Sequence, residues 1–273
     1  MHILITNDDG VTAPGLLALA QAMRPFGRVS IVAPDHDWSG CGHTKHFQRP
    51  LRVEKVTLLN GLNAYATDGS PADCVAMAAM GLLDEPVDFV MSGINSAANL
   101  GFDITYSGTT AAVKEAMIWK LPGIAVSLDL QRQPEANYSL AAEVASQVLA
   151  TVLEADHPLN VYLNVNVPNI PKEQFRGIRL TRMGIRVYRD RLEKRVDPRG
   201  NDYYWIGGDT PTGIPQEGAD IGAVAQGYAA ITPLQLDYTA YSLLPVLSTW
   251  NWPTPTQISA NGTTHETAVP AFA

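Results

Sequence analysis

The chain has 273 residues, 46% of them apolar, which is enough for one large core or for a core with a small appendage. Its formal net charge of −8 argues against a general nucleic-acid binder, because an acidic surface repels a phosphate backbone. No apolar run is long enough to span a bilayer, the start shows no export signal, and there are only two cysteines. We therefore expect a reduced, cytoplasmic protein without a membrane or nucleic-acid partner.

The first two thirds of the chain alternate short apolar runs with amphipathic segments. Residues 1–6 predict a buried strand, 14–23 a helix that begins at Pro14, and 29–32 a second strand. The pattern continues with helices over 72–80, 109–119 and 138–154 and strands over 89–91, 124–127 and 161–167. This order predicts an α/β fold with a mostly parallel sheet flanked by helices, occupying residues 1–175 as a catalytic core.

The composition changes after about residue 175. Arginines and lysines cluster between residues 179 and 199, and tyrosines and Trp205 lie among them or just after. The turn sequence at 197–201 separates two strand-like runs and predicts a projecting hairpin over about 181–205. We assign 176–249 to this hairpin and an oligomerisation region, with a core strand returning at 227–233, and 250–273 to a tail rich in Pro and Thr.

Two adjacent carboxylates, Asp8 and Asp9, follow the first predicted strand, and Gly10 permits a sharp turn there. Neighbouring residues in a strand point to opposite faces, so these side chains converge only where the strand stops. Ligands bind at the carboxyl ends of strands in open parallel sheets, and a hard cation relieves the repulsion between two carboxylates. The alternative is a solvated acidic turn, which the position after a buried strand disfavours.

Two further loops are expected at the same edge of the sheet, at 33–40 and at 91–101. Ser39 in the first and Asn95 in the second can each offer a neutral oxygen to a metal. Glycine, serine and asparagine are ordinary loop residues, so each loop alone is weak evidence.

A helix is predicted to begin within the run Ser107-Gly108-Thr109. Free N–H groups at a helix start, a glycine that allows close approach and nearby hydroxyls together predict a phosphate cradle. Simple capping of the helix by Ser107 or Thr109 is the alternative, and the two roles are compatible.

These residues bring the chain into resemblance with the survival protein SurE family. The matching segments are NDDGV at 7–11, APG at 13–15, APD at 33–35, SG at 39–40, PADCV at 71–75, SGIN at 92–95, NLG at 99–101, YSGT at 106–109, LNVNVP at 163–168, TRMG at 181–184 and ITPL at 231–234. They occur in order over nearly the whole chain, to about residue 240, and chance does not produce such a series.

The resemblance implies a Rossmann-like sheet, a swapped C-terminal element and a homodimer or homotetramer. It also implies metal-dependent hydrolysis of nucleoside 5′- and 3′-monophosphates, sometimes of short polyphosphate. The family's metal ligands fall on Asp8, Asp9, Ser39 and Asn95, and its phosphate-contacting segment falls on Ser107, Gly108 and Thr109. We also expect the two aspartates to be catalytic and Asn95 to contact phosphate.

The chain departs from the family pattern after Gly40, where Cys41-Gly42-His43-Thr44-Lys45-His46 replaces the usual small residues and Ser-Leu-Thr run. His43 and His46 could protonate a leaving group or contact phosphate. We favour the alternative that they have no chemical role, because the resembled family works without them. Cys41 is expected to pack and not to act as a nucleophile.

The four proposed ligands are all oxygens, so we expect one Mg²⁺ or Mn²⁺ per subunit, at a site that Ca²⁺ could also occupy. Such an ion would polarise a phosphoryl oxygen and lower the pKa of bound water, which Asp8 or Asp9 could orient. An aspartyl-phosphate enzyme is disfavoured because its two aspartates are usually separated by one residue. The remaining alternative is a non-catalytic nucleotide or metal sensor on the same fold.

Overall fold

The computed structural model describes residues 1–58, 61–130, 135–155, 161–209 and 211–253. The chain forms two units, Met1–Leu236 and Asp237–Ala273. The described part of the second unit contains one short helix, α6 (Leu244–Leu247). The predicted Pro/Thr-rich tail lies outside the described residues from position 254 onward.

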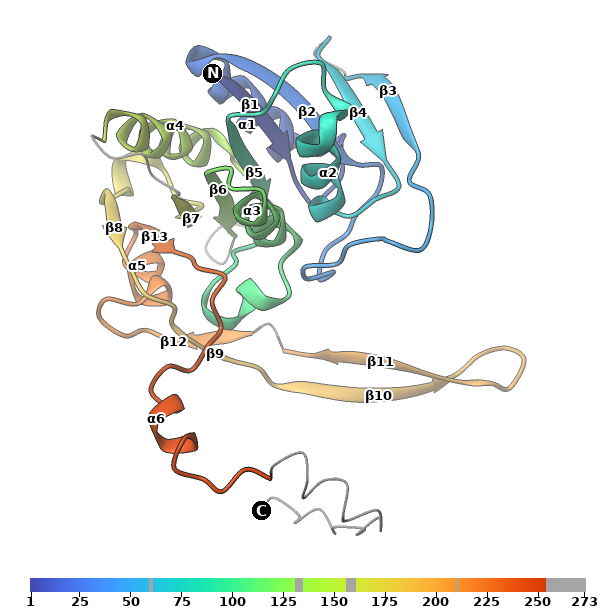
Figure 1. The fold of residues 1–273 in the computed structure, drawn as a ribbon, viewed down its shortest axis with the longest axis vertical. Helices are drawn as coiled ribbons and strands as arrows, with labels where there is room; N and C mark the ends of the chain where they lie inside the picture. The colour runs from blue at the N-terminus through green and yellow to red at the C-terminus, as the bar shows by residue number, and fades with distance from the viewer. Residues whose placement is uncertain (59–60, 131–134, 156–160, 210, 254–273) are drawn as a thin grey trace. The chain divides into compact units, whose positions relative to one another are not determined.

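Within the described residues, the first unit is built on a nine-stranded sheet of order β3-β4-β2-β1-β5-β6-β7-β13-β8 (Figure 1). Its strands are β1 (His2–Thr6), β2 (Arg28–Pro34), β3 (Val53–Thr57), β4 (Asn63–Thr67), β5 (Phe89–Asn95), β6 (Gly123–Asp129), β7 (Tyr162–Pro168), β8 (Ile178–Leu180) and β13 (Ala229–Pro233). The pairs β3–β4 and β7–β13 are antiparallel, and the other neighbours are parallel. The predicted mostly parallel α/β sheet is confirmed.

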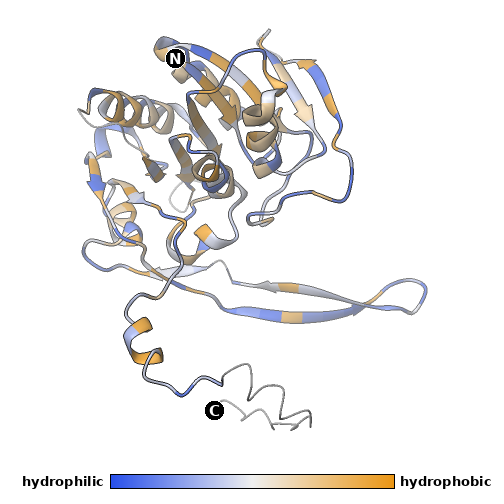
Figure 2. Ribbon diagram, viewed as in Figure 1, coloured by the Kyte–Doolittle hydropathy of each residue, from blue (hydrophilic) through white to orange (hydrophobic). Residues whose placement is uncertain are grey.

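Helices cover both faces of the sheet, and the hydropathy colouring shows its central strands to be mostly apolar (Figure 2). Alternation along β1 explains the two layers, because Ile3 and Ile5 face one way and Leu4 the other. Helices α1 (Pro14–Met23) and α4 (Ser139–Glu154) pack on the first face, and α2 (Pro71–Met77) and α3 (Gly108–Ile118) on the second. β1, β5 and β6 are buried along their whole length, as apolar runs in a parallel sheet should be.

Several boundaries differ from the sequence prediction. The strand predicted over 89–91 continues to Asn95, which carries that side chain to the carboxyl edge of the sheet. The helix predicted over 72–80 ends at Met77 and continues as a wider helical turn, Ala78–Leu82. The pair β3–β4 and the helix α5 (Asp220–Ala225) were not predicted. Short 3-10 turns lie at Arg24–Phe26, Gly101–Thr105 and Lys172–Gln174.

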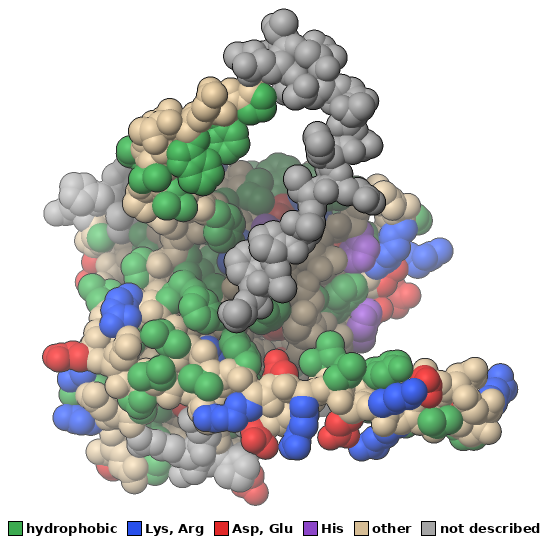
Figure 3. Space-filling view, turned by 90° about the horizontal axis from the view of Figure 1, so that it is seen from below, with side chains coloured by type: hydrophobic (Ala, Val, Ile, Leu, Met, Phe, Trp, Pro, Cys, Tyr) green, Lys and Arg blue, Asp and Glu red, His purple; other side chains and the backbone are tan. Residues whose placement is uncertain are grey.

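The predicted hairpin is present as β10 (Asp190–Val196) and β11 (Asp202–Gly208), an antiparallel pair that extends away from the sheet (Figure 1). The Asp197 carboxylate accepts hydrogen bonds of 2.8 Å from the backbone N–H groups of Arg199 and Asn201 and closes the turn. A second short pair, β9 (Ile185–Val187) and β12 (Thr212–Ile214), forms the root of the hairpin. Basic, acidic and hydrophobic side chains are mixed along the exposed hairpin (Figure 3).

Among the helices in the described ranges, none combines the length and the apolar composition needed to cross a lipid bilayer.

Candidate active site

The two adjacent aspartates lie where β1 ends, at the carboxyl edge of the sheet, and the chain turns away at Gly10 with a φ of 101°. They open into a cavity of about 280 Å³. The cavity is lined by Asp8, Asp9, Ser39, Gly40, Asn95, Ser96, Ala97, Ala98, Asn99, Asp103, Tyr106, Ser107 and Pro211. The structure therefore brings together all four predicted metal ligands, from the loops after β1 and β2 and the end of β5.

Asp8 is buried against the start of α3. The Thr109 hydroxyl donates a 2.6 Å hydrogen bond to Asp8 Oδ1, and the Thr109 backbone N–H also bonds this carboxylate. A Cβ at Gly108 would lie 2.7 Å from Asp8 Cβ and 3.0 Å from Cys41 Sγ, so a glycine is needed for this close approach. The positive end of the helix thus stabilises the Asp8 carboxylate.

Asp9 is held less tightly, by the backbone N–H and the hydroxyl of Ser96, each at 3.3 Å. Burial raises the pKa of Asp9 to about 6, and the neighbouring Asp8 charge adds to the effect. Burial likewise raises the pKa of Asp8, against the opposing hydrogen bonds from Thr109. Two partly desolvated carboxylates side by side are unfavourable as anions, and a bound cation would offset that cost.

Ser39 and Asn95 contribute neutral oxygens. Ser39 Oγ donates a 2.6 Å hydrogen bond to Asp37 Oδ1, which leaves its lone pairs for another partner. Asn95 Nδ2 donates a 2.6 Å bond to the Ala97 carbonyl, and the Oδ1 atom on the other side of the amide is the one that could bind a cation.

The donor set fits a hard divalent cation and not a thiolate-seeking metal. In the described ranges, no three His, Cys, Asp or Glu side chains come together as a metal site. A metal at the candidate site would therefore need the serine and amide oxygens as ligands in addition to the two carboxylates.

The predicted phosphate-binding run has two parts with different roles. Ser107 lines the cavity and also caps α3, because its Oγ accepts a 3.1 Å hydrogen bond from Thr110 N–H. Thr109 is fully buried and its hydroxyl is directed to Asp8, as described above. Gly108 provides the space for Asp8. The capping role of Ser107 is confirmed, and direct phosphate contact by the run stays a prediction.

The loop after Gly40 is fastened to two helices by buried carboxylates. His43 Nε2 and Lys45 Nζ bond Glu115 of α3 at 2.9 and 2.6 Å, and His46 Nδ1 bonds Asp73 of α2 at 2.7 Å. Neither histidine lines the cavity that contains the aspartates. The geometry thus supports a structural role for both rings, and their lack of a chemical role stays a prediction.

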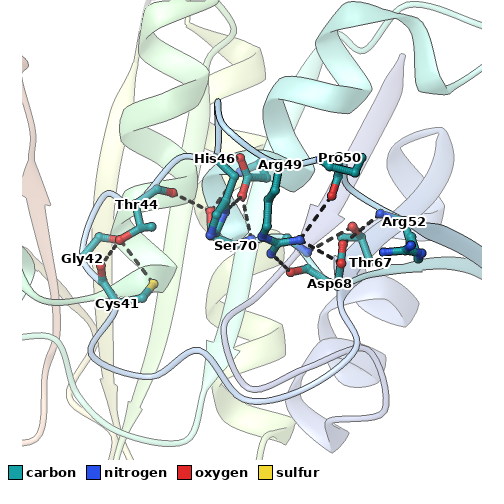
Figure 4. Close-up of polar contacts among 12 residues, drawn as sticks. Cys41, Gly42, Thr44, His46, Arg49, Pro50, Arg52, Thr67, Asp68 and Ser70 are labelled. Carbon is teal, nitrogen blue, oxygen red and sulfur yellow. Dashed lines mark hydrogen bonds and ion pairs between the residues drawn. The ribbon is translucent and has the colours of Figure 1, made fainter.

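Figure 4 shows further contacts that fix this loop. The Thr44 hydroxyl donates a 2.6 Å bond to the Cys41 carbonyl, and the Ser70 hydroxyl a 2.5 Å bond to the Thr44 carbonyl. Farther along, Arg49 pairs with Asp68 at 2.8 Å. The Cys41 thiol is directed to the Gly42 carbonyl at 3.2 Å, and burial raises its pKa to about 11, which disfavours the thiolate a nucleophile would need.

A buried asparagine cluster behind Asp8 was missed from the sequence. Asn99 Nδ2 donates to Ser127 Oγ at 2.8 Å and lies 3.4 Å from Thr109 Oγ1, and the Asn99 backbone N–H bonds Asn166 Oδ1 at 2.7 Å. Asn164 and Asn166, which alternate along β7, both bond the Asn99 carbonyl. Two asparagines at strand spacing inside an apolar run were the available signal.

A mostly parallel sheet with an oxygen-lined, carboxylate-bearing cavity at its carboxyl edge places the chain in the class of α/β proteins that bind ligands at this edge. The model of the family described as survival protein SurE matches residues 3–190. The chain belongs to this family.

Relatives of the chain are similar to it in sequence over most of their length. The chain is 47% identical to the 5′-nucleotidase SurE of Herpetosiphon aurantiacus, over 92% of this chain and 99% of that protein. It is 45% identical to the 5′-nucleotidase SurE of Chloroflexus aggregans, over 92% of this chain and 100% of the relative. The crystal structure of the SurE protein from Aquifex aeolicus superposes with a TM-score of 0.75 at 38% identity, covering 91% of this chain and 98% of that chain.

Proposed function

We propose that this protein is a metal-dependent 5′-nucleotidase, which hydrolyses nucleoside 5′-monophosphates to a nucleoside and phosphate. The observation that carries the proposal is the convergence of Asp8, Asp9, Ser39 and Asn95 on one cavity at the carboxyl edge of the sheet. Close similarity to two proteins named 5′-nucleotidase SurE supports the choice of substrate class.

The metal would be held by Asp8, Asp9, Ser39 and Asn95, with Mg²⁺ or Mn²⁺ as the expected ion and Ca²⁺ as a possible occupant. When bound, the ion supplies charge neutralisation and polarisation of a phosphoryl oxygen. Asp8 or Asp9 would orient an attacking water, and the looser hold on Asp9 supports the choice of Asp9.

The chain's other residues hold the ester. Ser107 and Asn95 line the cavity and can reach a phosphoryl oxygen directly. Gly108 and Thr109 act one step behind them, because they fix Asp8 at the helix start. A phosphoryl group bound in this way would lie among polar groups that the fold already holds in position, which favours the charge that develops in the reaction.

We further propose activity on 3′-monophosphates and short polyphosphate, a cytoplasmic location, and assembly into a homodimer or homotetramer with a swapped C-terminal element. The exposed hairpin supports assembly, since Leu192, Trp205 and Ile206 are 66, 59 and 82% exposed. The domain boundaries at residues 175 and 249 remain part of this proposal. The alternative, a non-catalytic sensor, is not favoured by the similarity to proteins named 5′-nucleotidase SurE, and it predicts binding without turnover.

The test is phosphate release from AMP with Mn²⁺, with Mg²⁺ and with a chelator. We expect metal-dependent turnover that Asp8→Asn and Asp9→Asn each abolish while the circular dichroism spectrum is preserved. Asp68→Asn is the matched control, because Asp68 lies outside the cavity and pairs with Arg49. Near wild-type rates in both aspartate variants at saturating metal would refute the site, and AMP binding without any turnover would favour the sensor.

A further inference from the structure

A third aspartate, Asp103, lines the cavity alongside Asp8 and Asp9. It lies in the 3-10 turn Gly101–Thr105, one turn before the start of α3. Its side chain is 17% exposed and bonds two residues from the root of the hairpin: Arg186 Nε donates to Oδ2 at 2.6 Å, and the Tyr188 hydroxyl to Oδ1 at 2.7 Å. The carboxylate thus has a fixed orientation at the cavity wall.

The buried Arg186 side chain bonds Asp103 but leaves one of its own nitrogens without a partner among the described residues. Its side chain is 7% exposed, and its buried Nη1 atom has no hydrogen-bond partner among the described residues. A buried guanidinium nitrogen without a partner is unfavourable, so the position of the arginine is determined by the Asp103 pair and not by its own full set of bonds. Burial, together with the bond to Asp103, raises the pKa of Tyr188, which keeps its hydroxyl neutral and able to donate.

The backbone around this group is rigid on both sides. The N–H groups of Gly101 and Gly184 each donate a 2.8 Å bond to the buried carboxylate of Asp220. Gly101 has a φ of 53°, and a Cβ there would lie 2.5 Å from the Gly184 carbonyl oxygen. The hairpin root and the turn that carries Asp103 are therefore locked together, as preorganisation of a binding group requires.

A carboxylate in a cavity that binds phosphate esters would repel the substrate unless a positive charge or a hydrogen-bond donor offset its negative charge. A phosphomonoester dianion offers only acceptors, so it would be repelled by Asp103, and the Arg186 charge offsets that repulsion. A carboxylate has about four lone-pair sites, and the Arg186 and Tyr188 bonds leave roughly two of them for the cavity. Groups of a nucleotide that donate to a carboxylate, away from the phosphate, include the hydroxyls of its sugar.

We propose that Asp103 recognises the substrate by accepting hydrogen bonds from sugar hydroxyl groups, and that Arg186 and Tyr188 are positioning residues that hold it for this role. This inference rests on the proposed nucleotidase function, and it adds that the site recognises the sugar hydroxyl groups of the substrate. It makes the hairpin root part of the specificity apparatus, in addition to any role in assembly.

The experiment compares kcat/KM for AMP, for 2′,3′-dideoxy-AMP and for phenyl phosphate, which has no sugar, with Mn²⁺ present. The wild type should prefer AMP to the dideoxy nucleotide by about 10- to 100-fold, the range expected for a hydrogen bond to a charged acceptor. Asp103→Asn should remove most of this preference, mainly through the KM for AMP. Phenyl phosphate should be hydrolysed as well as before or better, because a negative charge has left the cavity.

Tyr188→Phe tests positioning with little risk to folding, since it removes only the hydroxyl that bonds Asp103. It should lower the AMP preference by a smaller factor and leave phenyl phosphate unchanged, and Arg186→Lys should behave likewise. An equal loss on all three substrates, or a wild type that does not distinguish AMP from its dideoxy analogue, would overturn the inference. Failure of the nucleotidase proposal is a separate result: no phosphate from either nucleotide while phenyl phosphate is hydrolysed.

Discussion

Glu115 on α3 offers a quantitative test of how the loop beside the active site is held. Its side chain is 1% exposed and accepts hydrogen bonds from His43 at 2.9 Å, Lys45 at 2.6 Å and Trp119 at 2.8 Å. Burial alone would raise its pKa, but these three donors outweigh burial and lower it from 4.5 to about 2. At about 1.36 kcal/mol per pH unit, the difference corresponds to about 3 kcal/mol of stability at neutral pH.

The sign of the pH dependence follows from the lowered pKa. The stabilisation is fully present above pH 4.5, where the carboxyl would be ionised in the unfolded chain, and is lost as the pH falls towards 2. We expect Glu115→Gln to lower the melting temperature at pH 7 by roughly 6–12 °C, given about 2–4 °C per kcal/mol for a chain of this size. The difference in melting temperature between this variant and the wild type should fall below half of its value at pH 7 when the pH is lowered to about 3.

Thermal unfolding followed by circular dichroism at a series of pH values measures both effects. Asp68→Asn is the matched control, because Asp68 also accepts from an arginine but its side chain is 29% exposed. It should change the melting temperature much less than Glu115→Gln. A Glu115→Gln protein that melts with the wild type at pH 7, or a difference that persists unchanged at low pH, would refute the assignment of Glu115 as the charged anchor of the loop.

Three more outcomes are expected. Millimolar Mn²⁺ or Mg²⁺ should raise the melting temperature by mass action, and Asn95→Ala should weaken the response; a melting curve insensitive to metal would count against a preformed site. Gly108→Ala should lower activity at least tenfold, since its Cβ would lie 2.7 Å from Asp8 Cβ, and unchanged kinetics would show that Asp8 can move freely. Replacing Arg189–Asn201 by a short turn should lower the oligomeric state in light scattering or the affinity for longer polyphosphates; if neither changes, the hairpin is only a solvated appendage.

The strands that could be predicted from the sequence are those whose burial produces a simple hydrophobic pattern. β1, β5 and β6 are apolar runs because both of their faces are covered, and the helices between them show stripes of matching period. β3 was missed because it is partly exposed and contains Glu54 and Lys55, so its pattern resembles a loop. α5 was missed because it has only six residues and is held by the bonds of Asp220, which are long-range.

The candidate site divides in the same way. Asp8 and Asp9 could be chosen because a strand end followed by glycine makes adjacent carboxylates converge, which is a local argument. Glu115 and Asp103 could not be chosen, because each takes its significance from residues 70 or more positions away in sequence: Lys45 for Glu115 and Arg186 for Asp103. One carboxylate in a helix and one in a short turn carry no local sign of such partners.

The start of α3 explains why the phosphate-binding run was only partly interpretable from sequence. Free N–H groups at a helix start stabilise whichever anion lies closest, and a sequence cannot say which that is. In the structure the anion is Asp8, which takes the N–H and hydroxyl of Thr109. These bonds oppose the rise in pKa that burial imposes and so favour the charged form that a cation would need. The start of the helix is therefore engaged by a carboxylate of the protein itself, and Ser107 is the member of the run that lines the cavity; contact of the run with phosphate stays a prediction.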